Sequence, residues 1–274
     1  AKLSILPAID FPTFGTIVAG GGDVAEFKMA ARDLARAISA VEFAISTEET
    51  RYYLNGIFMH RTIDEADGRD VLCFVATDGH RLSKITMPLP DGAKSLQGVI
   101  IPRKTVGEIE RITKEVDGDS LITIRVNSAK IEIDAGNLHL ASKLIDGTFP
   151  DYGRVIPQGN DKEMKVDRDE FAAAVDRVST ISSERGRAVK LSLSTGVMRV
   201  DASGAETGSA TEEIAIDFDG DAAEIGFNSR YVLDVVSKIE GDKVRLAISD
   251  PGSPAVLTDP SDPSILMILM PMRA

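Results

Sequence analysis

Apolar side chains recur along this chain at two spacings, one typical of helices and one typical of strands. The clearest helical stripe is spaced by four, three and four residues and consists of Leu34, Ile38, Val41 and Ile45. It predicts one buried face of a helix over about 28–46. Residues 121–126 instead alternate between apolar and polar, which is the period of a half-buried strand. Further helices, separated and followed by strands, are predicted over about 103–116, 167–182 and 229–239.

The pattern starts again after a linker at residues 147–153, which contains two glycines and a proline. The stripe that begins at Leu34 aligns with one that begins at Phe171, an offset of 137 residues (171 − 34). Val106 in the second predicted helix aligns more loosely with Val232. The repeat predicts an α+β fold of two modules, residues 23–147 and 148–274, whose helices cover one face of a sheet.

The chain ends on an apolar run, residues 265–270, followed by Pro271, Met272, Arg273 and Ala274. Six large apolar residues predict a buried strand and are too few to span a bilayer, which takes about 20. Methionine also recurs at surfaces that accept several partners. The tail is therefore either a strand that completes a core or part of a binding surface.

Acidic residues outnumber basic ones by 43 to 31, giving a net charge of −12 at pH 7. This balance counts against phosphate binding, which relies on Lys and Arg. On the first predicted helix, however, Lys28, Arg32 and Arg36 are spaced by four and fall opposite the apolar stripe. Lys104 and Arg111 repeat this on the second. Such faces are either ordinary solvent-exposed faces or a positive surface that meets a polyanion.

Residues 77–82 join two strand-like runs, 72–76 and 83–87, through an Asp-Gly pair that is typical of a tight hairpin turn. The turn would place His80 and Arg81 at the rim of a sheet. This arrangement is compatible with an ordinary polar hairpin tip as well as with a binding site.

Motifs for catalysis or cofactor binding are not recognisable. The histidines His60, His80 and His139 lack metal-ligand spacing to one another and to Cys73. Phosphate-loop, GxGxxG and GxSxG motifs do not occur. We therefore expect no catalytic residue, metal or cofactor. The single cysteine excludes an intramolecular disulfide, and without a signal peptide or transmembrane run we expect a cytoplasmic protein.

Eight segments, taken together, carry a family resemblance. They are RYYLNG (51–56), ATDGHRL (76–82), IPRK (101–104), SKLIDG (142–147), FPDY (149–152), GFN (226–228), YVLDV (231–235) and MPMR (270–273). In this order and spacing they resemble the bacterial sliding clamp, the β subunit of DNA polymerase III, over essentially the whole chain from about residue 4.

The resemblance implies a fold and a task. Family members have three similar domains, each with two helices on the inner face of antiparallel sheets, and two subunits close head to tail around duplex DNA. This chain matches the middle and C-terminal domains, so residues 1–22 are expected to be a remnant of the N-terminal domain and linker in a truncated or proteolysed chain. The family is not catalytic, because it tethers the polymerase. Ring closure would involve Thr180 and Ile181, and without the N-terminal domain we expect a monomer.

Two sets of site residues follow from the resemblance. The residues implied to face DNA, without sequence preference, are Lys28, Arg32, Arg36, Arg51, Tyr52, Tyr53, Lys104 and Arg111. The family also binds short peptides with a Gln then Leu/Phe pattern, carried by the polymerase III α subunit, the clamp loader, translesion polymerases and mismatch-repair proteins. The pocket lies between the two domains, and the matching residues are Leu54, Thr77, Gly79, His80, Arg81, Leu82, Pro150, Arg154, Val155, Asn228, Tyr231, Ile268, Leu269, Met270, Pro271, Met272 and Arg273.

Some positions depart from the family pattern. Gly186 stands where an aromatic pocket wall is expected, Pro254 where a small polar residue is expected, and Gly153 where a basic residue often occurs. These changes predict a groove that is wider or more mobile at that wall.

Two other classes of protein remain open. A metal-dependent nucleotidyltransferase or nuclease would act on a primed template and lose that activity with a chelator. A purely structural repeat protein would not bind a peptide such as Gln-Leu-Ser-Leu-Phe.

Overall fold

The computed structural model describes residues 24–64, 67–181, 187–204 and 208–273. Across these ranges no helix is both long and apolar enough to cross a membrane. The expected remnant at residues 1–22, and Gly186 and Ala274, lie outside the described residues.

The first half of the chain consists of eight strands and two α-helices. In chain order they are β1 (Ala25–Ala30), α1 (Ala31–Val41), β2 (Gly56–Ile63), β3 (Asp70–Thr77), β4 (Arg81–Pro88), β5 (Val99–Pro102), α2 (Arg103–Glu115), β6 (Leu121–Val126), β7 (Lys130–Ala135) and β8 (Leu138–Lys143). Short 3₁₀ helices lie at η3 (Glu42–Ala44), η4 (Glu49–Leu54) and η5 (Ala93–Ser95).

The second half repeats this order after the 3₁₀ helix η6 (Tyr152–Val155). Its elements are β9 (Lys162–Asp167), α3 (Arg168–Ser179), β10 (Ala188–Ser194), β11 (Val197–Gly204), β12 (Gly208–Asp217), β13 (Ala223–Asn228), α4 (Ser229–Val236), β14 (Lys243–Ile248), β15 (Ala255–Asp259) and β16 (Asp262–Leu269). The offset of 137 residues is confirmed, because it separates the first residues of β1 and β9 (162 − 25) and those of α1 and α3 (168 − 31).

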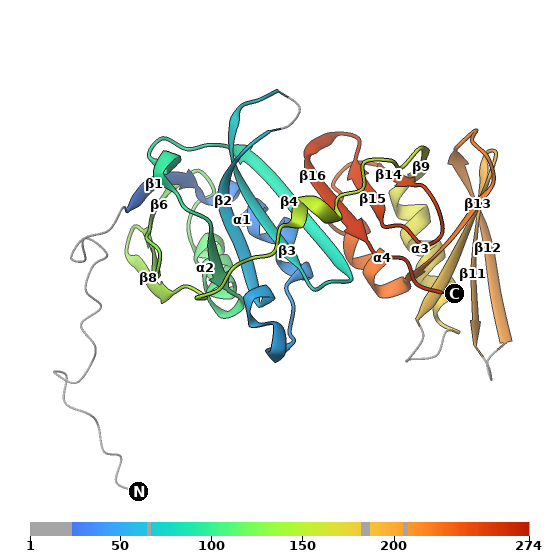
Figure 1. Cartoon of the computed structure of the whole chain (residues 1–274), viewed down its shortest axis with the longest axis horizontal. Coiled ribbons are helices and arrows are strands. Elements are labelled where there is room, and N and C mark those ends of the chain that lie inside the picture. Colours follow the sequence, from blue (N-terminus) through green and yellow to red (C-terminus); the bar gives the residue numbers. More distant parts are fainter. Residues whose placement is uncertain (1–23, 65–66, 182–186, 205–207, 274) are drawn as a thin grey trace, which may run out of the picture.

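One sheet runs through both halves. Strands β1-β6-β7-β8 form a four-stranded sheet, and the other twelve form a sheet in the order β13-β10-β11-β12-β9-β14-β15-β16-β4-β3-β2-β5. The halves meet where β16 pairs antiparallel with β4, from Ile265 opposite Ile85 to Leu269 opposite Arg81. Figure 1 shows this junction in the middle of the molecule, with the segment that joins the halves crossing in front of it.

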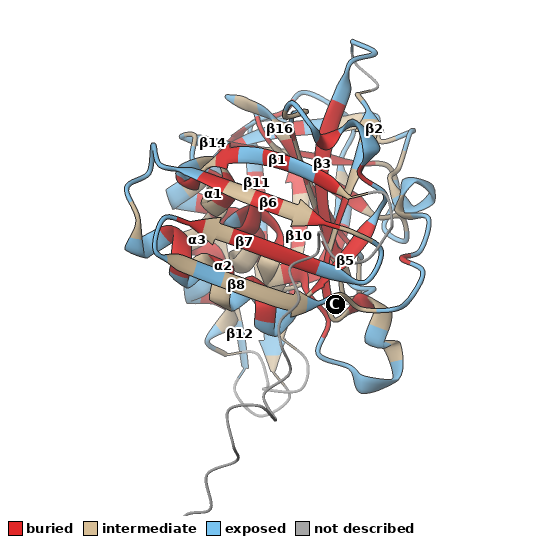
Figure 2. Ribbon diagram, turned by 90° about the vertical axis from the view of Figure 1, so that its left-hand side faces the viewer, coloured by how far each residue is buried: buried red, intermediate tan, exposed pale blue. Residues whose placement is uncertain are grey.

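The helices pack on one side of the sheets. In α1, Leu34, Ile38 and Val41 are buried, as the stripe predicted. Figure 2 looks onto the four-stranded sheet of the first half, with the helices behind it. In β1, Phe27 and Met29 point into the core while Glu26 and Lys28 are exposed. The apolar stripe and the strand alternation thus meet in one core.

Two details of the first predicted helix are wrong. Residues 28–30 belong to β1, where Lys28 lies opposite Thr123 of β6. Because Phe27 and Met29 face the core, Lys28 points to the opposite side of the sheet, away from the helices. The helix also ends before Ile45, which is buried but follows the 3₁₀ helix η3. The four-residue spacings from Lys28 to Arg32 and from Val41 to Ile45 therefore extend past the two ends of the helix by coincidence.

Candidate functional site

The turn between β3 and β4 is built by its own side chains, and it confirms the predicted hairpin. Gly79 has a φ of +87°, which L-residues rarely adopt. The Asp78 carboxylate accepts hydrogen bonds from the backbone N–H groups of His80 (2.9 Å) and Arg81 (3.0 Å). The Thr77 hydroxyl donates to the carbonyl of Arg81 (2.7 Å) and accepts from the N–H of Gly79 (3.1 Å). These bonds fix His80 at the rim.

The C-terminal tail lies along this turn. The N–H of Met270 donates to the carbonyl of His80 at 2.8 Å, and the N–H of Met272 donates to the carbonyl of Gly226 at 2.9 Å. Ile268 and Leu269 are buried, whereas the Met270 side chain is 41% exposed. The interpretation of the tail as a strand that completes the core is therefore confirmed up to Leu269, while a binding surface from Met270 onward stays a prediction.

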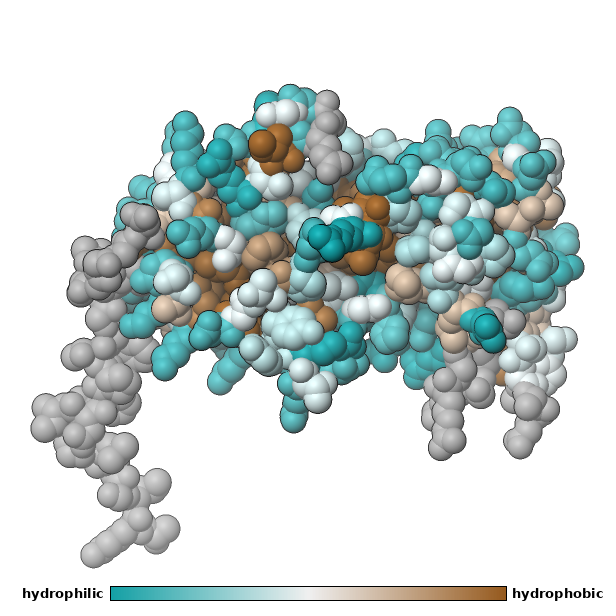
Figure 3. Space-filling view, in the orientation of Figure 1, coloured by the Kyte–Doolittle hydropathy of each residue, from teal (hydrophilic) through white to brown (hydrophobic). Residues whose placement is uncertain are grey.

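A small apolar cluster lies under the turn and the tail. It is separate from the main core and consists of Leu54, Cys73, Val75, Leu82, Ile100, Phe149 and Ile268. Val155 and Met270 remain largely exposed beside it, at 47% and 41%. Figure 3 shows hydrophobic surface in the middle of this face, near the segment that joins the halves. The structure thus brings Leu54, Leu82 and Ile268, which are far apart in sequence, into one apolar floor.

The segment that joins the halves, between β8 and β9, is held in place by aromatic residues that the sequence pattern did not single out. Phe149 stacks on Phe58 with ring centroids 4.8 Å apart. The Tyr152 hydroxyl donates to Nε2 of His60 at 2.9 Å, because Nδ1 of His60 lies 3.0 Å from the carbonyl of Arg61 and must carry the proton. Burial lowers the pKa of His60, which favours this neutral form. The FPDY motif (149–152) was the only signal in the sequence that pointed to this aromatic contact.

Burial also raises the pKa of the Cys73 thiol to about 11. The thiol is therefore protonated at neutral pH and is not a nucleophile. It packs under Tyr152 as a small apolar group, with Sγ 3.7 Å from the hydroxyl oxygen. Cys73 is therefore a buried residue of the small apolar cluster.

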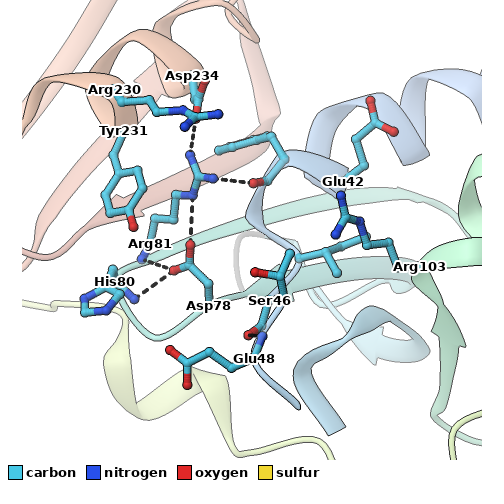
Figure 4. Close-up of a pocket in the computed structure, with 13 residues that line it drawn as sticks. Glu42, Ser46, Glu48, Asp78, His80, Arg81, Arg103, Arg230, Tyr231 and Asp234 are labelled. Atoms are coloured by element: carbon cyan, nitrogen blue, oxygen red, sulfur yellow. Dashed lines mark hydrogen bonds and ion pairs between the residues drawn. The ribbon is translucent and has the colours of Figure 1, made fainter. Parts of the chain in front are cut away.

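Two cavities flank the turn and the tail. One of about 460 Å³ is lined by Pro271, Met272 and Arg273 together with Lys190 and Glu224. The other, of about 550 Å³, lies between the halves and is shown in Figure 4. It is lined mainly by charged residues, which include Glu42, Asp78, Arg81, Arg103, Arg230 and Asp234.

Several residues implied to bind peptide have other local tasks. Arg81 turns its guanidinium into the second cavity and is only 11% exposed. Asn228 caps α4, because its side-chain oxygen accepts from the N–H of Arg230 at 3.0 Å. Arg154 is 85% exposed and pairs with Asp151. Pro150 is exposed in the joining segment, and Pro254 accepts a hydrogen bond from Asn160 (3.0 Å) through its carbonyl.

The basic residues implied to face DNA are mostly paired. Arg32 pairs with Asp119, and Arg111 pairs with Glu108 and Glu115. Such exposed pairs are worth less than about 1 kcal/mol, so a phosphate can replace the carboxylate. Lys104 is exposed and has no ion pair within the described ranges. Lys28 faces away from the helices, which contradicts its placement on the basic helix face.

Arg36 connects the two halves. Its Nη2 pairs with Asp262 at the start of β16 and donates to the hydroxyl of Ser264 at 3.0 Å. Partial burial would raise the pKa of Asp262, but the hydrogen bonds from Ser264 and Arg36 lower it below its ordinary value. Arg36 therefore lies on the helix face and also forms an ion pair across the junction between the halves.

The loop that carries Arg51, Tyr52 and Tyr53 packs against the hairpin turn. Arg51 forms two hydrogen bonds to Glu48 (2.8 and 2.6 Å), and a Cβ placed on Gly79 would lie 2.5 Å from its Nη1. Hydrogen bonding from Arg51 lowers the pKa of Glu48. Tyr52 is 53% exposed, whereas Tyr53 packs against the small apolar cluster. The loop at residues 51–53 and the hairpin turn at residues 77–82 are thus neighbours.

Thr180 and Ile181 lie at the end of α3, where the Thr180 hydroxyl donates to the carbonyl of Arg177 at 2.7 Å. No cluster of three or more potential metal ligands occurs among the residues that the structure describes.

Known proteins match the chain throughout. The model of the DNA polymerase III beta subunit, central domain, matches residues 28–151, and that of its C-terminal domain matches residues 153–273. The beta sliding clamp of Caulobacter vibrioides is 45% identical over 272 residues, which cover 99% of this chain and 71% of that protein. The clamp of Escherichia coli K12 is 35% identical with the same coverage.

Solved structures match as well. A sliding clamp from Bartonella birtlesii bound to griselimycin superposes with a TM-score of 0.92 at 43% identity, over 100% of this chain and 72% of that one. A Pseudomonas aeruginosa clamp bound to griselimycin superposes with a TM-score of 0.89 at 35% identity, over 98% and 70%. With its α+β architecture of repeated antiparallel sheets and helices, the chain belongs to the bacterial β sliding clamp family, the β subunit of DNA polymerase III.

Proposed function

We propose that this chain holds short peptide motifs of replication and repair proteins in the groove formed by the hairpin turn 77–82, the joining segment 150–155 and the tail 270–273. The observation that carries the proposal is the hydrogen bond from Met270 to His80 above the apolar cluster. It closes an apolar floor with a polar rim, which is the anatomy of a peptide anchor site. Two related clamps bind griselimycin, which supports a ligand site in this family.

The proposed partners are the α subunit of DNA polymerase III, the clamp loader, translesion polymerases and mismatch-repair proteins. Their motifs would place Leu or Phe side chains against the exposed Val155 and Met270, beside the buried apolar cluster. The Arg81 guanidinium is left out of the direct contacts, because it is hydrogen-bonded to Asp78, Asp234 and the carbonyl of Phe43.

We further propose that the chain works within a ring around duplex DNA, as a head-to-tail homodimer of the whole protein. Lys104, Tyr52 and Arg111 would meet the duplex without reading its sequence. The division into residues 23–147 and 148–274, the absence of catalysis and a cytoplasmic location belong to the same proposal.

The internal repeat supports the proposed ring contact at Thr180 and Ile181. With the offset of 137, Thr180 corresponds to Phe43 of η3, which directly follows α1 (180 − 43). Phe43 lies at the junction, with Nζ of Lys238 from the second half 5.9 Å from its ring. By analogy, Thr180 and Ile181 would meet the next domain around the ring.

Titration with the peptide Gln-Leu-Ser-Leu-Phe tests the groove. We expect micromolar binding, and a loss of at least about tenfold in affinity for His80→Ala or Met270→Ala, since truncated anchor residues typically cost more than 1 kcal/mol. His139→Ala, in an exposed strand of the first half, is the matched control and should bind normally. Unchanged affinity in both groove variants would contradict the proposal.

A further inference from the structure

Three of the five N–H groups of the Arg81 guanidinium, one on each nitrogen, donate hydrogen bonds inside the protein. Nε donates to Asp78 (3.1 Å), Nη1 to Asp234 (2.5 Å) and Nη2 to the carbonyl of Phe43 (2.6 Å). The side chain is 11% exposed. Figure 4 shows the guanidinium between the carboxylates of Asp78 and Asp234. A guanidinium bound in this way has little left to offer a peptide.

The same guanidinium lies between two aromatic rings. Its central carbon is 5.1 Å from the ring centroid of Phe43 and 4.4 Å from that of Tyr231. The Tyr231 ring in turn lies 6.3 Å from that of His80, at an angle of 26°. Cation–π contacts of this kind are strongest when they are shielded from water.

These contacts connect the two halves at one end of their shared ladder. Asp78 and Phe43 belong to the first half, and Tyr231 and Asp234 belong to α4 of the second. The backbone of Arg81 forms the last pair of the β4–β16 ladder, opposite Leu269. Arg81 therefore connects the sheet layer to the helix layer at the end of the β4–β16 ladder, where the proposed groove begins.

We propose that Arg81 is a positioning residue that fixes the second half against the first and holds Tyr231 beside His80, and that its guanidinium does not contact the peptide. The proposal deepens the proposed function, because it rests on a groove that needs Tyr231 and His80 in register. Without Arg81, the carboxylates of Asp78 and Asp234 would lose their shared counter-charge and repel each other. The ladder would persist, but α4 would no longer be held to the turn.

The experiment compares Arg81→Met, Asp234→Asn and the double variant. The matched control is Arg230→Met, because Arg230 lines the same cavity but has no ion pair among the described residues. One readout is the affinity for Gln-Leu-Ser-Leu-Phe. The other is the distance between spin labels at Ser128→Cys and Thr195→Cys, which lie in turns of the two halves. Cys73 is buried and does not compete for the label.

We expect Arg81→Met to lower the affinity about tenfold or more and to broaden the label distance. The double variant should recover part of both, because it removes the repulsion that Arg81→Met creates. Asp234→Asn should lower the affinity only about threefold, because a neutral hydrogen bond replaces a charged one. This mild variant tests the proposal even if Arg81→Met does not fold. Arg230→Met should change neither readout.

Three results would overturn the proposal. The first is a loss of affinity in Arg81→Met with an unchanged label distance and no recovery in the double variant, which would make Arg81 a direct peptide contact. The second is full affinity and an unchanged distance in Arg81→Met. The third is an Asp234→Asn variant that matches the unaltered chain in both readouts. If the unaltered chain binds no peptide, the proposed function fails, while the label distances still test the role of Arg81.

Discussion

The two halves share one fold but differ on the outer faces of corresponding strands. With an offset of 126 residues, which also relates the first residues of α2 and α4 (229 − 103), Cys73 and Val75 of β3 correspond to Arg199 and Asp201 of β11. The first pair is fully buried, whereas the second is an ion pair whose side chains are 47% (Arg199) and 23% (Asp201) exposed. A sheet that is apolar on both faces needs a cover, and the joining segment supplies it. The candidate groove therefore exists in one half only.

In both halves, the segment that lies next to the sheet is hydrogen-bonded to one of its strands in the same way. The N–H of Ile145 donates to the carbonyl of Ile100 in β5, and the N–H of Met272 donates to that of Gly226 in β13. Ile100 and Gly226 are again 126 residues apart (226 − 100). After Ile145 the chain lays Phe149 and Tyr152 over the sheet, whereas the sheet beside Met272 carries Lys190 and Glu224. The two halves therefore differ in the side chains on this face of the sheet, and not in the backbone hydrogen bonds that hold the neighbouring segment.

The largest effect is expected from a charge on the covered face. Val75→Asp should lower the free energy of unfolding by about 4 kcal/mol or more, because it buries an unpaired carboxylate. Asp201→Val, the reverse change at the corresponding position, should cost less than about 1 kcal/mol. Denaturant titration of both variants measures this contrast. Similar costs at the two positions would show that the outer faces do not differ as described.

Removing the cover should have a slightly smaller effect. Phe149→Ala should destabilise the chain by about 3 kcal/mol, because it opens a cavity beside Phe58. It should also weaken peptide binding, since Val155 would lose its support. Val155→Ala is the control, and should leave thermal stability nearly unchanged because its side chain is 47% exposed. Equal stability of both variants would mean that the segment does not depend on its aromatic anchor.

His60 makes the cover sensitive to pH. Burial lowers its pKa in the folded chain below the ordinary value of 6.5, so the unfolded chain takes up a proton that the folded chain resists. The free energy of unfolding should therefore fall as the pH drops through 6.5 towards the lower folded-state pKa. The difference is about 1.4 kcal/mol at most for each unit between the two pKa values. His60→Gln should lack this dependence in thermal melts between pH 5 and 8, and the same slope in both proteins would refute the assignment.

The smallest effect is expected on the uncovered face. Lys190 and Glu224 form an ion pair of 3.2 Å that is accessible to solvent. A double-mutant cycle with Lys190→Ala and Glu224→Ala should give a coupling below about 0.5 kcal/mol that disappears at high salt. A coupling above about 2 kcal/mol would mean that this face is shielded in solution, as the corresponding face of the first half is.

Much of the fold was predictable from periodicity. The apolar stripe at Leu34 and the strand-like run at 72–76 each describe one local element, and the predicted helix and strand are both present. Lys28 was misplaced because its spacing to Arg32 fits a helix, while the alternation of Phe27 and Met29 decides in favour of a strand. The roles of the site residues rest on the family resemblance and remain proposals.

Other features could not be predicted from local pattern. Arg36 pairs with Asp262 and Arg81 with Asp234 across 226 and 153 residues, and no local spacing indicates either partner. The aromatic anchors Phe58, His60 and Tyr152 likewise meet only when the joining segment folds back over the sheet.

The sequence by itself determined where most of the helices and strands lie, that the pattern repeats, and that the run 71–76 is apolar on both faces of its strand. These properties follow from the period of each element and from the need to remove apolar side chains from water. Only the tertiary structure decided what covers that run, which arginines are already paired, and which groups of the two halves meet around the Arg81 guanidinium. Such contacts depend on how whole layers pack, because a side chain takes its partner from the neighbouring layer and not from its neighbours in the chain.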